Sequence, residues 1–165
     1  MKIRLFFFLV IACIWSGCKS RSAFDYSQAI VKIESEFAAD IVKADKDFMR
    51  LSNENQTDSA AIITAQMEAM AKSRLKQIKE LKVPDVDEGE NFKRAAIHYF
   101  TYLETVYTSL NKMTQATGEK EKEEERIKLS KIVADKDEAT KTLQVAQQKF
   151  AAANNFRIEK VNSGD

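Results

Sequence analysis

The 165-residue chain has few of the residues that make turns, disulfides or metal sites: one proline, four glycines, two cysteines and one histidine. Both cysteines, Cys13 and Cys18, lie near the start, so the rest of the chain has no disulfide framework and no cysteine-based metal or redox site. Because strands and hairpins need frequent turn residues, this composition favours long helices stabilised by a hydrophobic core alone.

The same scarcity removes most catalytic and cofactor motifs. The chain has no Cys-x-x-Cys-His for haem attachment, no Glu-x-x-His pair for a carboxylate di-iron centre and no glycine-rich phosphate loop. A Ser-His-Asp or Cys-His triad would have to use His98, the only histidine, and no motif surrounds it. We therefore expect no catalytic, cofactor-binding or metal-ligating residues. His98 is expected on the outer surface, the alternative being a lone metal or haem ligand.

An excess of charge of one sign is also missing. Lys2 and Arg4 are two of the 26 Lys and Arg residues, and none of the 25 Asp and Glu residues precedes position 18, so residues 18–165 have a formal charge of −1. Nucleic-acid binding requires a basic surface that neutralises phosphates. The balance of charge therefore argues against nucleic acid as a partner.

What the chain does have, at its start, is the layout of a secretory signal peptide. Lys2 and Arg4 form a basic beginning, residues 5–12 are apolar, and two small residues precede Cys18. The apolar run is well short of the roughly 20 residues that span a bilayer as a helix. A cleaved leader at residues 1–17 is therefore favoured over a permanent transmembrane anchor.

The Ser16-Gly17-Cys18 ending resembles the lipobox of bacterial lipoproteins. In that family the Cys thiol receives a diacylglycerol, a peptidase cuts before the Cys, and the new amino group is acylated with a fatty acid such as palmitate. Trp15 departs from the aliphatic residue that is common three positions before the Cys. We predict lipidation at Cys18, with the rival site at Cys13 left open.

The residues after the cysteine bear on location. Lys19 stands where enteric lipoproteins carry Asp when they are retained at the inner membrane. The resemblance therefore implies a lipid-anchored protein of the cell envelope, at the outer membrane. Residues 18–24 are predicted to be a polar tether.

Four helices are predicted, each with apolar residues in steps of three and four that share one face: 25–51, 59–82, 87–117 and 119–154. The pattern is an unbroken heptad seam in the third helix, as in a coiled coil. Asp87 and Glu90 have capping-box spacing at its start. Leu103 and Leu143 lie in the middle of their seams and are expected in the core.

Helices of similar length with short connections favour an all-α, up-down-up-down antiparallel four-helix bundle over residues 25–158, followed by a frayed tail at 159–165. The alternative is a three-helix array with one helix extended as a coiled-coil arm, whose solvated part would be the charged run at 119–126. That run could also be a docking surface.

Only three polar residues occupy seam positions: Arg74, Thr117 and Lys136. The long stems of Arg74 and Lys136 could lie on the core edge with their charged heads in water. Alternatively, one or both could pair with a carboxylate across the bundle and fix which helices are neighbours, with Glu34, Glu36 and Glu104 as candidates. Tyr99, Tyr102 and Tyr107 are expected in the core, the alternative being a ligand groove.

Two further stretches, 92–100 and 148–156, resemble small helical surface lipoproteins of diderm bacteria. This resemblance implies location and fold and carries no catalytic chemistry. The sequence predicts a non-catalytic envelope lipoprotein that binds an envelope protein, polymer or small hydrophobic ligand at the membrane surface. The alternative, a periplasmic helical-bundle enzyme or a cofactor or metal carrier, needs convergent polar side chains inside the bundle.

Overall fold

The computed structural model describes the backbone of residues 3–158 and the side chains of residues 19–158. All regular elements in this part of the chain are helices, which confirms the predicted all-α class. Their bounds are α1 Ile3–Asn53, α2 Thr57–Glu80, α3 Gly89–Gln115, α4 Glu119–Ala134 and α5 Lys136–Ala153. The bounds of α2 and α3 lie within two residues of the predicted ones, and α4 with α5 replaces the fourth predicted helix.

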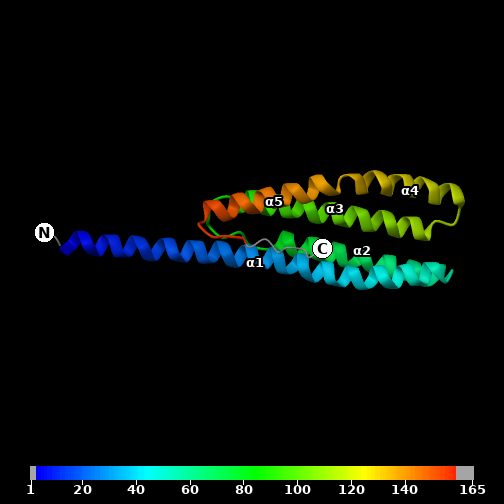
Figure 1. Ribbon diagram of the computed structural model, residues 1–165, viewed down its shortest axis with the longest axis horizontal. Helices are drawn as coiled ribbons and strands as arrows, with labels where there is room; N and C mark the ends of the chain where they lie inside the picture. The colour runs from blue at the N-terminus through cyan, green and yellow to red at the C-terminus, as the bar shows by residue number, and fades with distance from the viewer. Residues whose placement is uncertain (1–2, 159–165) are drawn as a thin grey trace.

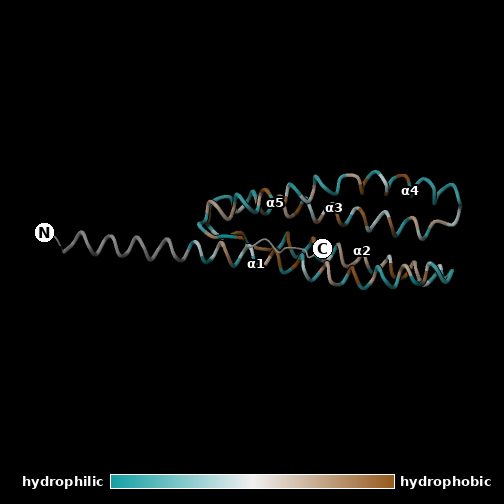
Figure 2. Tube along the Cα trace, viewed as in Figure 1, coloured by the Kyte–Doolittle hydropathy of each residue, from teal (hydrophilic) through white to brown (hydrophobic). Residues whose placement is uncertain are grey.

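The helices pack in sequence order. Figure 1 shows α1 against α2, and α3 against α4 and α5, with α2 and α3 joining the two pairs. With α4 and α5 taken together as one interrupted helix, the structure has four long helices, each in contact with the next, which is consistent with an up-down bundle. Outside the residues drawn in grey, Figure 2 shows hydrophobic residues interspersed with hydrophilic ones along the helices, as expected for helices with one buried face.

The core is densest where α3 begins and α5 ends. Phe92 and Phe150, both 0% exposed, stack with ring centroids 5.1 Å apart, and Tyr26 of α1 packs edge-on against both at 6.1 and 5.9 Å. Phe37 of α1 meets Phe100 of α3 further along the bundle, at 6.2 Å. Three helices therefore converge on one aromatic cluster.

Burial falls along the bundle toward the α3–α4 connection. The predicted core position Leu143 is buried, whereas Leu103 is half-buried against the core. Within the described chain, α4 has no buried residue and packs on α3. The charged run at 119–126 is mostly exposed and forms ion pairs within α4, such as Arg126 with Glu123 at 2.8 Å.

Residues 19–24 differ from the predicted polar tether because they are part of α1. Ala23 is 0% exposed, and the ring of Phe24 packs edge-on against Phe156 at 5.7 Å. Ala23 and Tyr26 extend the apolar steps that continue through Ile30, so helix and core begin before residue 25.

The side chains of residues 1–18, including Cys13 and Cys18, and the whole of 159–165 lie outside the described residues. The predicted cleavage, lipidation and frayed tail fall there.

The fourth predicted helix is interrupted at Asp135. The interruption coincides with Lys136, the charged residue in the apolar seam of that helix, and Lys136 is exposed. A charged side chain is costly to bury without a partner, so a break that leaves it in water is the favourable arrangement. The prediction of one continuous helix over 119–154 is wrong at this point.

The predicted capping box at Asp87 and Glu90 is also wrong. The N-cap of α3 is Glu88, in a left-handed conformation with φ 61°, and its side chain makes no capping hydrogen bond. Gly89 follows, and a Cβ at that position would lie 2.6 Å from Cγ1 of Val83. The side chain of Val83 packs over the start of α3, and a glycine at position 89 leaves room for it.

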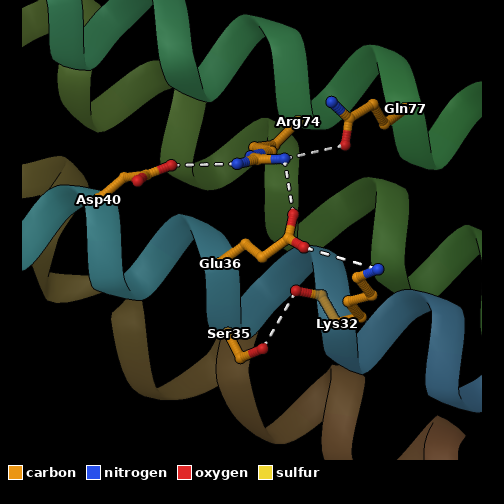
Figure 3. Close-up of polar contacts among 6 residues, drawn as sticks. All are labelled: Lys32, Ser35, Glu36, Asp40, Arg74 and Gln77. Atoms are coloured by element: carbon orange, nitrogen blue, oxygen red, sulfur yellow. Dashed lines mark hydrogen bonds and ion pairs between the residues drawn. The ribbon is translucent and has the colours of Figure 1, made fainter.

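Arg74 forms ion pairs with carboxylates across the α1–α2 interface. This confirms, for Arg74, the alternative in which the charged residue pairs across the bundle. Its guanidinium donates to Glu36 at 3.1 Å and to Asp40 at 3.0 Å, on successive turns of α1, and to Gln77 at 3.2 Å (Figure 3). Glu36 and Asp40 are about half exposed, so each ion pair contributes little stability. The planar guanidinium instead fixes the register of α1 on α2.

Candidate functional site

A groove of about 540 Å³ runs between α3 and α5. Its size lies within the range of about 300 to 1,000 Å³ that is common for small-molecule sites. Its apolar part consists of Ala95 on α3 with Val145 and Ala146 on α5, and Val145 is 41% exposed. We call it the α3–α5 groove.

Basic side chains dominate its polar part. Arg94 on α3 and Lys141 and Lys149 on α5 line the groove, and all three are exposed. Glu88 contributes the carboxylate, which accepts a hydrogen bond of 2.7 Å from the amide of Asn91. The lining therefore has an excess of positive charge on a chain whose formal net charge is +1.

A second cavity of about 310 Å³ adjoins the break between α4 and α5. Its charge has the opposite sign, because Asp135 and Glu138 line it together with Tyr102. Burial is the main cause that raises the pKa of Tyr102, and Asp135 adds to it. Of the three tyrosines, Tyr102 lines a cavity, whereas Tyr99 and Tyr107 are half-buried against the core as expected.

His98 lines both cavities. Its side chain is exposed, which confirms the prediction that it lies on the outer surface. Among the described residues, no group of three or more His, Cys, Asp or Glu side chains is placed to hold a metal ion. The α3–α5 groove can therefore recognise a ligand by charge, hydrogen bonds and apolar contact.

A cluster of polar side chains between α2 and α3 has no counterpart in the sequence predictions, and we call it the Glu68 layer. Glu68 of α2 accepts hydrogen bonds from Lys72 at 2.6 Å and from Asn111 and Thr108 of α3 at 2.6 and 3.0 Å. The fully buried Thr64 lies 2.7 Å from the hydroxyl of Thr114.

The hydrogen bond from Lys72 is the main cause that lowers the pKa of Glu68, with the bonds from Asn111 and Thr108 adding to it. A carboxylate held in its ionised form by three donors is a poor general base. The Glu68 layer lines neither of the two cavities described above. Its polar side chains therefore act in pairing α2 with α3.

Glu34 of α1 differs from Glu68 because its pKa is raised and not lowered. Burial raises its pKa above the ordinary glutamate value of 4.5, and a hydrogen bond with Tyr99 opposes this shift in part. Burial, with the nearby Glu34 carboxylate, raises the pKa of Tyr99 to about 12. Glu34 is therefore a partly buried acid whose charge opposes folding at neutral pH.

We expect Glu34→Gln to raise the free energy of unfolding at pH 7. The folded-state pKa of Glu34 is raised, so the ionised form is disfavoured in the folded protein and stability is lost as pH rises through the interval above 4.5. Urea unfolding at pH 7 and at pH 4 measures this, and the gain should shrink at pH 4. Exposed Glu138→Gln is the control, and an equal gain at both pH values would contradict the expectation.

Within the described part of the chain, none of the helices combines the length and the hydropathy that a membrane span requires. Comparisons with protein-family models, with curated proteins and with solved structures find no match to this chain.

Proposed function

We propose that this chain is a non-catalytic lipoprotein of a bacterial cell envelope, anchored by acyl chains on Cys18 and acting as a binding module at the membrane surface. The observation that carries the proposal is the order of basic, apolar and small residues that ends at Cys18. Residues 1–17 are then the signal peptide, and Lys19 after the anchor favours the outer membrane. The helical body is the part that meets a partner.

The α3–α5 groove supports the assignment to binding. It combines cations from two helices with an apolar floor, and the hydrogen bonds among its lining residues are local to the start of α3, where Asn91 donates to Glu88 and Arg94 donates to Asn91. The alternative of a bundle enzyme or cofactor carrier requires convergent reactive side chains, and no observation favours it. The partner is an envelope molecule that reaches this groove.

Mass spectrometry of the mature protein tests the anchor. We expect an N-terminus at Cys18, with the mass of a diacylglycerol and one further acyl chain. A mature chain without acylation at either cysteine would refute the proposal. A mature chain that begins at an acylated Cys13 would move the anchor and keep the class of protein.

Cys18→Ala should move the protein from the membrane fraction to the soluble fraction of disrupted cells. Two or three acyl chains give stable anchoring, whereas single weak contacts give reversible binding. Cys13→Ala is the matched control and should leave the protein in the membrane fraction. Equal behaviour of the two variants would contradict the assignment of Cys18.

A further inference from the structure

We propose that the α3–α5 groove binds a phosphate-bearing amphiphile, with the phosphate at the cations and the alkyl part on the apolar floor. This rests on the proposed function only in taking the helical body to be a binding module. The occupant follows from the chemistry of the lining. The lining holds three cationic side chains and one carboxylate, so the groove favours an anion.

The number of cations favours phosphate over carboxylate. A phosphate monoester carries about 1.5 to 2 negative charges near neutral pH and presents three acceptor oxygens, so several cations can bind it at once. Arg94 offers a planar fork of donors, and Lys141 and Lys149 offer ammonium groups from the facing helix. A singly charged carboxylate would leave part of this charge without a partner.

The floor of the groove adds the second half of the specificity. Ala95 and Ala146 are small, and Val145, at 41% exposed, presents its side chain to solvent between Lys141 and Lys149 on α5. These four-residue steps place Lys141, Val145 and Lys149 on one face of the helix. An alkyl chain over Val145 would therefore lie beside a phosphate at either lysine.

His98 makes the proposal directly measurable. It lines the groove and is the only histidine of the chain, so the proton signals of its imidazole ring are assigned without ambiguity. The full chain in a non-ionic detergent is titrated with hexyl phosphate, inorganic phosphate and hexanoate. We expect hexyl phosphate to shift the ring signals and to bind at least about tenfold more tightly than either other anion, a difference of about 1.4 kcal/mol.

Each comparison can overturn one part of the proposal. Equal affinity for inorganic phosphate would refute the amphiphile and leave a free-phosphate site. Equal affinity for hexanoate would refute the preference for phosphate. Ring signals that do not move with any of the three would refute the site as a whole.

Two charge variants test the assignment to these residues. Lys141→Gln with Lys149→Gln should weaken hexyl phosphate binding by about tenfold or more, because the phosphate loses its lysine partner and the groove loses two positive charges. Lys43→Gln with Lys46→Gln on α1 makes the same change of net charge outside the groove and should alter affinity by less than about twofold. Equal losses in the two double variants would overturn the proposal.

Glu88→Gln is expected to increase the affinity for hexyl phosphate, which misfolding of the variant could not do. It removes the carboxylate from the lining, so we expect tighter binding of hexyl phosphate, by about threefold, because a repulsion is removed. Unchanged or weaker binding would count against the charge argument. If neither cysteine is acylated but hexyl phosphate moves the His98 ring signals, the lipoprotein alone is refuted, whereas an acylated Cys18 with ring signals that do not move refutes the groove alone.

Discussion

Phe150→Ala is expected to lower the free energy of unfolding by about 3 to 5 kcal/mol, the range for truncating a buried phenylalanine. Phe150 is 0% exposed, stacks on Phe92 and packs edge-on against Tyr26 and Phe156. Removing its ring leaves a cavity where α1, α3 and α5 converge. The loss combines the lost transfer free energy with incomplete relaxation around that cavity.

Urea unfolding of the full chain in a non-ionic detergent, followed by circular dichroism, measures this loss. Phe24→Ala is the matched control. Phe24 is 42% exposed and, among the side chains that the structure describes, packs against one ring, that of Phe156, so its truncation should cost less than about 1 kcal/mol. A loss below about 1 kcal/mol for Phe150→Ala would place the aromatic cluster outside the core.

Leu143→Ala is expected to cost about 2 to 5 kcal/mol, as for other buried leucines. Leu143 of α5 is 6% exposed and belongs to the buried core. Leu103→Ala should cost at least about 1 kcal/mol less, because Leu103 is half-buried and its truncation removes less apolar surface from solvent. The same urea titration compares the two variants.

The two leucines occupy equivalent positions in the sequence, each in the middle of an apolar seam, so a difference between the two losses reports how well each is covered in the folded protein. Equal losses would mean that α3 is as well covered near residue 103 as α5 is near residue 143. That result would contradict the fall in burial toward the α3–α4 connection.

The positions of the helices could be predicted because the apolar periodicity ends where the helix-breaking residues stand. Pro84 and the polar segment after Leu51 interrupt strong apolar periodicity, so the bounds of α2 and α3 follow closely from the sequence. The start of α3 was harder to predict. It depends on Glu88 in a left-handed conformation and on the packing of Val83 over Gly89, and neither is a local sequence preference.

The buried face of α2 was predicted in part. Met67 and Ile78 of the expected apolar stripe are buried, as are Ala71 and Leu75 beside it, whereas Ala60 and Thr64 were not expected there. Small and hydroxyl side chains give a weak hydrophobic signal, so the pattern pointed to their larger neighbours. The Glu68 layer was missed for a different reason, because its members come together only when α2 packs on α3.

The candidate site was not predictable from the chain alone. Arg94, Lys141 and Lys149 look like ordinary exposed residues, and their shared lining depends on how α5 lies along α3. The prediction that His98 is exposed was correct, yet its position between two cavities of opposite charge is a tertiary property. The sequence left two alternatives open for the charged seam residues, a carboxylate partner across the bundle or a head group in water. The structure shows the first for Arg74, which pairs with Glu36, and the second for Lys136, which is exposed.

The unbroken course of α1 through residues 19–24 has a mechanical consequence for the lipid-anchored protein that we propose. A flexible tether would let the body turn freely above the bilayer, and its length could change without effect. A helix transmits rotation, and one added residue turns everything beyond it by about 100° and raises it by about 1.5 Å. The number of residues between Cys18 and Ala23 would therefore set the direction in which the α3–α5 groove faces.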